Sequence, residues 1–257
     1  MNIKLIVAAH KNYNMPKHEC YLPVQVGAEG KEDIGYTTDN TGDNISGKNP
    51  FFCELTGLYW GWKNLQCDYI GLAHYRRHFK EPKTNKKGIE AVLSDKTLHK
   101  LLKKSDIILP TKRKYYIENL YSHYEHTMHI EPLQKTREIL AKKYPEYLKE
   151  FDNLKKRTSA HMFNMYIMKK EISDKYCEWL FDILFELEEQ FKDAEYDGFH
   201  SRFYGRVSEL LLDVYINTNG LKYVETPLVY TEKIDWYRKI TGFLKAKFLG
   251  RKYDKSF

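Results

Sequence analysis

Short apolar runs alternate with segments of helical periodicity along the first half of this chain. The first run is Ile3–Ala9, and others follow at residues 21–26, at residues 69–75 and at Ile107–Pro110. Each has the length of a buried strand rather than that of a buried helix. Between the second and third runs, residues 51–65 place apolar side chains at helical spacing. The succession of strand, loop, helix and strand predicts an α/β domain.

The second half of the chain is mainly helical in pattern, with two further apolar strands. We expect helices over residues 88–104, 115–157, 171–191 and 208–217, and strands over 161–169, with Asn164 in the interior, and 222–230. No internal repeat or Pro/Ser-rich linker interrupts this pattern. The sequence therefore predicts one mixed α/β domain at residues 1–232 with a helical insertion. A basic amphipathic helix is predicted to follow as a tail at 233–257.

Composition narrows the class of protein. With 257 residues, 42% hydrophobic and 30% charged, the chain is typical of a soluble globular protein. Its net charge of +7 favours anionic partners such as nucleotides, nucleic acid or an anionic lipid surface. Four cysteines without paired spacing indicate a reduced, cytoplasmic compartment. Because no run approaches the ~20 apolar residues of a membrane span, we expect no transmembrane helix. The 21 tyrosines suit sugar or base binding, or else a tyrosine-rich core.

The run at 69–75 leads directly into cationic side chains, His74, Arg76, Arg77 and His78. Ligands of open α/β sheets bind beyond the carboxyl ends of strands, and arginine presents a planar, permanently charged fork that suits a diphosphate. If the strand continues, His74 and Arg76 face one side and Arg77 the other. We therefore expect only one arginine to touch the ligand. The alternative is an arginine that pairs with a carboxylate and stabilises the loop.

A long loop at residues 27–47 is expected to cover a site, because loops of this length in compact domains are usually functional. Residues 39–49 are rich in glycine and small polar residues that let backbone amides approach a ligand, and Lys48 lies among them. The segment matches neither a Walker loop nor a dinucleotide fingerprint. An ordinary surface turn is the alternative. His10 and Lys11, which close the first strand, join the candidate binding residues.

Two further clusters lie in the helical half. His123, His126 and His129 recur every three residues, a spacing that drifts around a helix and does not favour a metal site. They are expected to line an acceptor cleft or a polar helix face. Asp197 precedes an apolar helix, and Glu209 is expected in the first turn of that helix, where the dipole favours a carboxylate. Glu209 is therefore a candidate general base or a plain helix-start residue.

Several motifs along residues 3–230 resemble one bacterial protein family. They are Gly42-Asp43-Asn44-Ile45-Ser46, residues 53–64 (CELTGLYWGWKN), residues 69–79 (YIGLAHYRRHF), residues 163–168 (FNMYIM) and residues 204–209 (YGRVSE). The chain is similar to capsule and exopolysaccharide biosynthesis proteins long catalogued as a domain of unknown function. That family includes members assigned as galactosyl- or galactofuranosyltransferases.

The resemblance implies a glycosyltransferase with a Rossmann-like A-type fold. It would transfer a hexose, galactose or galactofuranose, from a donor such as UDP-galactose or UDP-galactofuranose to a lipid-linked or growing polysaccharide. Many A-type enzymes end a strand with Asp-x-Asp, which holds a divalent cation. Here the matching strand ends in His74-Tyr75-Arg76, so we expect arginine to neutralise the diphosphate with no required cofactor. Bound Mn²⁺ or Mg²⁺ is the alternative, and no metal ligand is assigned.

The resemblance also implies a catalytic base, a set of substrate-binding residues and binding partners, all of which are expectations. Asp43 and Glu209 are favoured as bases over Asp39, Glu54 and Asp197. The candidate substrate-binding residues are His10, Lys11, Lys48, Glu54, His74, Arg76, Arg77, His123, Asn164 and Asp197. The basic tail suits an anionic membrane surface, which would make the protein cytoplasmic and peripheral on the inner face of the plasma membrane. Alternatives are a non-catalytic sugar-nucleotide-binding assembly protein and a basic nucleic-acid-binding protein, although nucleic-acid recognition signatures are absent.

Overall fold

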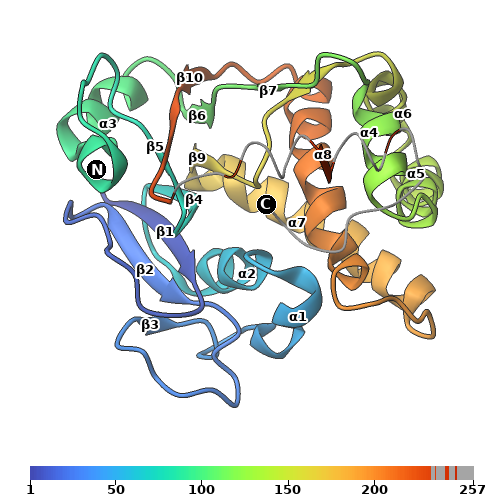
Figure 1. Cartoon of the computed structure of the whole chain (residues 1–257), viewed down its shortest axis with the longest axis horizontal. Helices are drawn as coiled ribbons and strands as arrows, with labels where there is room; N and C mark the ends of the chain where they lie inside the picture. Colours follow the sequence, from blue (N-terminus) through green and yellow to red (C-terminus); the bar gives the residue numbers. More distant parts are fainter. Residues whose placement is uncertain (233–234, 236–240, 243–246, 248–257) are drawn as a thin grey trace. The chain divides into compact units, whose positions relative to one another are not determined.

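A computed structural model describes residues 1–232 together with Asp235, Thr241, Gly242 and Lys247. The chain divides into two compact units (Figure 1). Unit 1 consists of Met1–Thr111, His161–Glu178 and Lys222–Glu232, and unit 2 consists of Lys112–Ala160, Trp179–Leu221 and the C-terminal residues. Apart from the four positions named above, the helix predicted at 233–257 lies outside the described residues. The boundary at residue 232 stays a prediction, and no linker composition marks the division into units.

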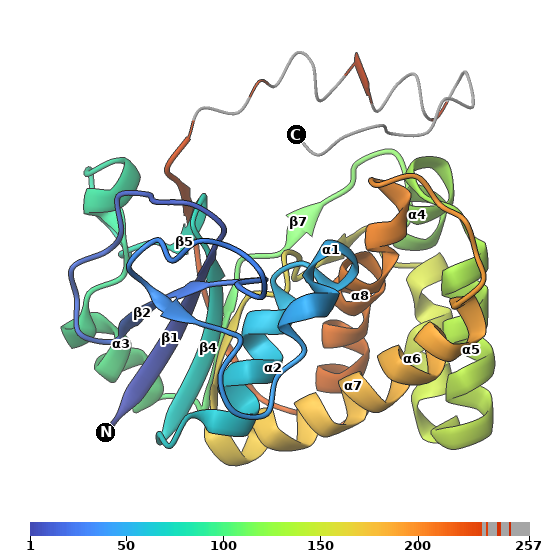
Figure 2. The ribbon, with the colours of Figure 1, turned by 90° about the horizontal axis from the view of Figure 1, so that it is seen from below.

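Unit 1 is built on a mixed sheet, which confirms the predicted α/β class. Among residues 1–232, nine strands form it, in the order β10-β6-β9-β4-β1-β2-β3, with β5 and β11 paired beside that path. Strand β1 pairs in parallel with both β2 and β4 (Figure 2), whereas β9 runs antiparallel to β4. The bounds are β1 Ile3–Ala9, β2 Tyr21–Gln25, β3 Thr37–Thr38, β4 Tyr69–His74, β5 Arg77–Phe79, β6 Ile107–Pro110, β9 Tyr166–Lys169, β10 Val224–Thr226 and β11 Leu228–Tyr230.

Helices cover both faces of this sheet, since β1 is buried on both sides. Leu5 and Val7 belong to a core cluster that includes Leu98 and Leu102 of α3 (Asp95–Leu102). Ile6 points to the opposite face, toward α2 (Leu55–Asn64). A Cβ built on Gly61 of α2 would lie 2.3 Å from Ile6 Cδ1, so glycine is what allows this helix to approach the strand so closely. Burial on both faces explains why β1 is apolar at every position from Leu5 to Ala9 instead of alternating with polar residues.

The strand order places a topological switch at β1. The chain passes from β1 to β2 on one side, and β4 later pairs with β1 on the other side. In open α/β sheets a crevice for ligands forms outside the carboxyl ends of strands at such a point. The sheet edge at Ala9 and His74 is therefore where a ligand is expected.

Two predicted helices of unit 1 are broken in the structure. The helix expected over 51–65 is interrupted at Cys53, whose φ of 53° is left-handed. A short helix α1 (Asn49–Phe52) precedes the break, and Glu54 becomes the N-cap of α2. The helix expected over 88–104 is a 3₁₀ turn η2 (Gly88–Ala91) followed by α3. Ser94 starts α3 by accepting a hydrogen bond from the Thr97 amide.

Two predicted strands also differ. The strand expected over 161–169 begins only at Tyr166, because Phe163 and Asn164 are both left-handed, with φ of 75° and 55°. Asn164 is thus in a turn before the strand and not in its interior. The strand expected over 222–230 is divided at Pro227 into β10 and β11, since proline cannot donate a ladder hydrogen bond. The two pieces pair with β6 and β5 respectively.

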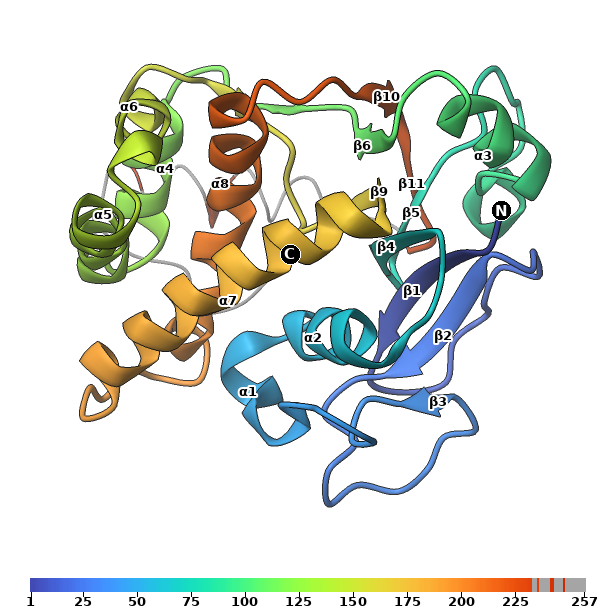
Figure 3. The same cartoon turned by 180° about the vertical axis from the view of Figure 1, so that it is seen from behind.

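Unit 2 is mainly helical (Figure 3). Its described residues also form one small two-stranded sheet, β7-β8. Its aromatic core packs Tyr147, Trp179 and Tyr215, with ring centroids of Trp179 4.7 Å from Tyr147 and 5.3 Å from Tyr215. Its elements are β7 Arg113–Lys114, α4 Leu120–Thr127, α5 Glu131–Lys143, η3 Pro145–Tyr147, α6 Leu148–Asp152, η4 Asn153–Lys155, β8 Ser159–Ala160, η5 His200–Arg202 and α8 Phe203–Thr218. The long helix α7 (Lys170–Phe191) contributes residues to both units, and η1 (Ser46–Lys48) belongs to unit 1.

Helix α8 begins at Phe203 rather than at residue 208. Glu209 therefore lies in the second turn, and the expectation that it occupies the first turn is wrong. The residues just before Ser208 are already helical, and most of them are buried. Glycine and polar residues among them make this first turn hard to recognise in the sequence. No helix among the described residues is long and apolar enough to cross a bilayer.

Candidate functional site

The cationic cluster lies on a tight hairpin. Strand β4 ends at His74, β5 begins at Arg77, and these two residues pair with each other. Tyr75 and Arg76 form the turn between them. The predicted alternation of faces over residues 74–77 is therefore wrong, because alternation requires one continuous extended strand. Nothing in the hairpin restricts the site to a single arginine.

Both arginines lie over aromatic rings. The guanidinium of Arg76 is 5.2 Å from the centroid of Tyr75 and 3.9 Å from a carboxylate oxygen of Glu232. Its buried Nε has no hydrogen-bond partner within the described part of the chain. The guanidinium of Arg77 is 4.4 Å from the centroid of Phe163. Stacking holds the forks in place while leaving in-plane N–H groups of Arg76 able to donate to an anion.

The two histidines of the cluster are neutral. Burial and then the charges of Arg77 and Arg76 hold the pKa of His74 well below its usual value. Burial lowers the pKa of His78 to about 4. His74 Nδ1 accepts a hydrogen bond from the backbone N–H of Arg76 at 3.3 Å, so the proton of this imidazole resides on Nε2. The positive charge of the hairpin is therefore carried by the arginines alone.

An aromatic platform adjoins the hairpin at the end of β1. Tyr13 and Tyr75 stack with centroids 3.8 Å apart, and His10 meets Tyr75 edge-on at 5.1 Å. Lys11 Nζ lies 5.2 Å from the Tyr13 ring. Tyr36 of the long loop donates its hydroxyl to Tyr13 O at 2.9 Å, so this loop reaches the platform, as an expected cover would. Tyr13 and Tyr36 were not predicted as site residues, since a single tyrosine carries no positional signal.

Glu54 and Asn164 come together from distant parts of unit 1. The Asn164 side chain, 2% exposed, donates from Nδ2 to Glu54 Oε1 at 2.8 Å. Three of the left-handed non-glycine residues, Cys53, Phe163 and Asn164, are these two residues or their direct neighbours. Such backbone conformations are costly and persist where the surrounding structure enforces them, often at functional sites. Phe163 also supports Arg77, so this turn links the carboxylate to the cationic hairpin.

The predicted loop residues have different surroundings. Asp39 is completely buried and accepts hydrogen bonds from Gly27 N, Ala28 N and Ser46 Oγ, which makes it the organiser of the loop. Asp43 lies beside the end of α2, where its backbone N–H donates to Asn64. Since α2 has ten residues and rises ~1.5 Å per residue, Asp43 is about 15 Å along the helix from Glu54.

The position of Asp43 has consequences for its predicted role. Its carboxylate, 59% exposed, accepts from the Tyr59 hydroxyl at 3.2 Å and lies 4.0 Å from Lys63. Burial and this carboxylate raise the pKa of Tyr59 to about 12. Lys48 ends the 3₁₀ turn η1, close in sequence to Glu54. The structure thus separates Asp43 from the hairpin and brings Glu54 toward it.

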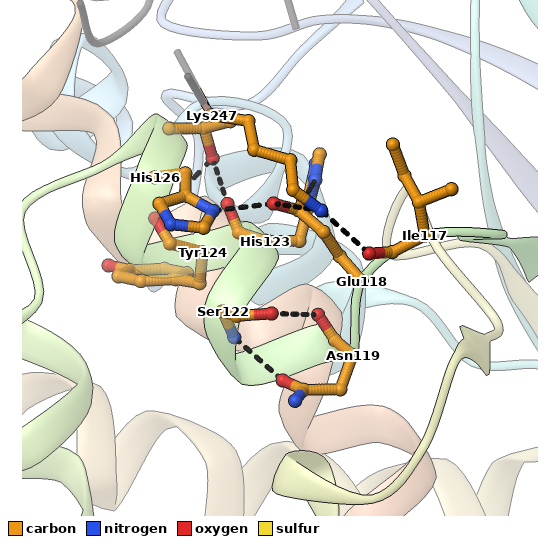
Figure 4. A network of polar contacts seen from close by, with 9 residues as sticks. Ile117, Glu118, Asn119, Ser122, His123, Tyr124, His126 and Lys247 are labelled. Carbon is orange, nitrogen blue, oxygen red and sulfur yellow. Dashed lines mark hydrogen bonds and ion pairs between the residues drawn. The ribbon is translucent and has the colours of Figure 1, made fainter. Parts of the chain in front are cut away.

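The remaining predicted residues lie in unit 2. Glu118, which was not predicted, has a buried carboxylate whose oxygens lie 3.0 Å from His123 Nδ1 and 2.5 Å from His126 Nδ1 (Figure 4). Burial lowers the pKa of His123 to about 4. Lys247 Nζ is 3.8 Å from the same carboxylate. Because Glu118 faces inward from a loop, neither periodicity nor spacing indicates it.

Asp197 and Glu209 are both engaged within unit 2. Asp197 accepts from the backbone N–H groups of Phe199 and His200 and from His200 Nδ1, and these bonds lower its pKa to about 2. Glu209 is buried and lies 3.2 Å from Arg206. Both carboxylates therefore have clear local roles as a turn cap and as one half of an ion pair.

The described residues include no group of three or more His, Cys, Asp or Glu side chains arranged to hold a metal ion. The strand end where many A-type glycosyltransferases carry carboxylates bears His74, Tyr75 and Arg76 instead. Arg76, Arg77 and a His74 imidazole whose Nδ1 is already engaged supply no oxygen ligand for a divalent cation, and the expectation that no metal is required stays a prediction.

Comparisons with known proteins agree with this geometry. One solved structure, described as "WbbM bifunctional glycosytransferase apo structure", superposes with a TM-score of 0.84 at 32% sequence identity. The match covers 91% of this chain and 46% of that one, so the chain corresponds to about half of its structural neighbour. No curated protein matches. The family model "Domain of unknown function (DUF4422)" matches residues 4–220, and the chain therefore belongs to the DUF4422 family.

Proposed function

We propose that this chain is a glycosyltransferase that moves a hexose from a nucleoside-diphosphate sugar to a lipid-linked or growing glycan. The observation that carries the proposal is the pair of arginines on the β4–β5 hairpin, at the switch point of the sheet. The structural neighbour, which is 32% identical and is described as a glycosyltransferase, supports the same class of reaction. A galactose or galactofuranose donor and a role in capsule or exopolysaccharide synthesis follow from the family resemblance.

Arg76 and Arg77 are proposed to hold the donor diphosphate. As the bond between the anomeric carbon and the diphosphate oxygen breaks, negative charge develops on the leaving group. Preorganised cations directed at that charge stabilise the transition state more than the ground state. Arg76 retains a buried, unbonded Nε–H for this purpose. Neutral His74 adds an Nε2–H donor without a third positive charge.

Tyr13 and His10 are proposed to contact the nucleobase or sugar ring. A flat aromatic surface packs against a base or against the apolar face of a hexose. The Tyr13–Tyr75 stack is adjacent to Arg76, so base and diphosphate contacts come from one continuous surface. Lys11 adds a cation at the same edge.

Glu54 is proposed to bind the acceptor hydroxyl and, in an inverting transfer, to accept its proton. The hydroxyl oxygen forms the new bond to the anomeric carbon, the diphosphate leaves with the bonding electron pair, and the proton passes to the carboxylate. Glu54 is favoured over Asp43 because Asn164 orients it within the turn that also supports Arg77. Asp43 lies near the far end of α2. The role predicted for Glu209 stays a prediction.

Donor binding tests the proposal directly. Uridine, guanosine and thymidine diphosphate sugars would be screened by thermal shift with Mn²⁺ and with EDTA, since specific binding stabilises the native state. Arg76→Gln and Arg77→Gln are expected to weaken donor affinity about ten- to hundredfold, because a hydrogen bond to a charged group contributes about 1.5–3 kcal/mol. Arg137→Gln, which removes an exposed arginine paired with Asp152, is the control.

The possible outcomes distinguish the proposed transferase with an arginine clamp, a metal-dependent transferase and a non-catalytic binding protein. Stabilisation by one donor class in EDTA, lost in the two site variants and kept in the control, supports the proposal. Strict dependence on Mn²⁺ with insensitivity to both arginine changes would overturn the arginine clamp. Donor binding with neither transfer nor hydrolysis would indicate a non-catalytic assembly protein.

The role of Glu54 is tested by turnover. Glu54→Gln keeps an acceptor for Asn164 and removes the base, so kcat is expected to fall about 10²- to 10⁴-fold with little change in donor KM. Asp43→Asn is the matched control and should leave kcat unchanged. The reverse result would return the base to Asp43.

A further inference from the structure

A short segment of unit 2, Lys112–Ile117, exposes apolar side chains beside a run of cations. Tyr116 is 88% exposed and Ile117 is 56% exposed, which places two neighbouring residues among the few large hydrophobic side chains that the described chain leaves in solvent. The three residues before Tyr115 are Lys112, Arg113 and Lys114, and the segment contains no acidic residue.

The exposure of Tyr116 and Ile117 is enforced by the backbone on either side. Tyr115, before them, is 8% exposed and its N–H donates to Thr158 O at 2.7 Å. Glu118, after them, is 5% exposed and its carboxylate is held by two histidines. The two exposed residues therefore form a projection between buried anchors. Two apolar side chains that project from a fixed loop are suited to insertion into a membrane or into an apolar surface of another protein.

The cations are arranged around this projection. Arg113 and Lys114 form β7, which pairs with β8, and the Arg113 guanidinium lies 4.8 Å from the Tyr115 ring. The turn that precedes β8 adds the exposed Lys155 and Lys156. The Glu118 carboxylate is buried against His123 and His126 rather than directed to solvent (Figure 4). Positive charge thus faces outward around an aromatic and an aliphatic side chain.

We propose that Lys112–Ile117 is a membrane-docking surface that binds an anionic lipid bilayer. Tyr116 and Ile117 enter the boundary between headgroups and acyl chains, where amphipathic aromatic rings are favoured. Lys112, Arg113 and Lys114 contact the lipid phosphates, and each basic residue near an anionic surface strengthens binding roughly fivefold. Lys247 of the predicted tail adjoins this surface, since its Nζ donates to Ile117 O at 2.7 Å. The proposal does not depend on the proposed transferase reaction.

Vesicle co-sedimentation of the full chain tests the proposal without donor or acceptor. The vesicles are pure phosphatidylcholine and a mixture with phosphatidylglycerol. We expect binding to the mixture, weakened by salt, and much weaker binding to phosphatidylcholine alone. Tyr116→Ser/Ile117→Ser and Lys112→Ser/Lys114→Ser are each expected to weaken binding to the mixture at least about tenfold.

Matched changes in unit 1 are the controls. Phe51→Ser removes another exposed apolar side chain, 45% exposed, and Lys86→Ser/Lys87→Ser removes two other exposed lysines. Both should bind as the unsubstituted chain does, and thermal unfolding confirms that all four variants fold. Absence of binding, equal binding to both vesicle types, or unchanged binding in either docking variant would overturn the proposal. Tight binding to nucleic acid that the docking substitutions abolish, with no vesicle binding, would replace lipid as the partner.

Discussion

The left-handed backbone at Asn164 predicts the sign of a stability difference. Asn164 has φ of 55° and donates to Glu54 at 2.8 Å. Asn164→Gly and Asn164→Ala both remove this hydrogen bond, and the difference between them is a methyl group on a left-handed residue. Alanine loses about 1–2 kcal/mol in that conformation, whereas glycine adopts it without cost.

The conformational entropy of the unfolded chain partly offsets the left-handed penalty of alanine. At an ordinary position, alanine is more stabilising than glycine by about 0.4–1 kcal/mol because it narrows the unfolded ensemble. At Asn164 the left-handed penalty is larger, so the alanine variant should be less stable than the glycine variant by about 0.5–1 kcal/mol. Both should be less stable than the natural protein by about 1.5–3 kcal/mol, the contribution of a hydrogen bond to a charged group.

Asn153 provides a matched control in unit 2. Its side chain also donates to a glutamate, Glu150, at 3.2 Å, but its φ is −66°. There the alanine variant should be more stable than the glycine variant by about 0.5–1 kcal/mol. The measurement is the free energy of unfolding in urea for the four variants at pH 7. If glycine and alanine rank in the same order at both positions, the reasoning from backbone strain is refuted.

Three further predictions concern stability. Burial lowers the pKa of His78 to about 4 from 6.5, so between pH 7 and pH 5 protons are taken up mainly by the unfolded chain. Protonation of His78 in the unfolded chain should therefore lower the free energy of unfolding by about 2 kcal/mol between pH 7 and pH 5. Urea titrations at the two pH values should show a fall smaller by this amount in His78→Gln, and an equal fall in both proteins would contradict the prediction. Asp39→Ala should cost about 3 kcal/mol or more, because it strips the acceptor from two buried N–H groups, whereas Asp33→Ala, which removes one exposed acceptor, should cost under about 0.5 kcal/mol. Equal denaturation midpoints would show that Asp39 does not organise the loop. Gly61→Ala should cost about 1–3 kcal/mol, and adding Ile6→Val should recover part of this in a double-mutant cycle; zero coupling would locate the strain elsewhere.

Much of the secondary structure could be predicted from the sequence because it depends on local patterns. Strand β1 and the long helix α7 lie within a residue of their predicted bounds. Their apolar spacing is regular over enough residues to exclude other conformations. The short strands β5 and β11 were not predicted as separate strands. Three residues carry no periodicity, and their conformation comes from pairing with each other across the sheet.

The candidate site was predictable only in its most local part. The local sequence is enough to show that His74, Arg76 and Arg77 follow a buried strand. That they form a hairpin depends on tertiary structure, because the return strand is set by pairing with β11. It likewise decided that Glu54 and Asn164 meet, since their contact depends on left-handed turns that the packed unit enforces. Local composition specifies which side chains are present, and long-range packing specifies which of them face one another.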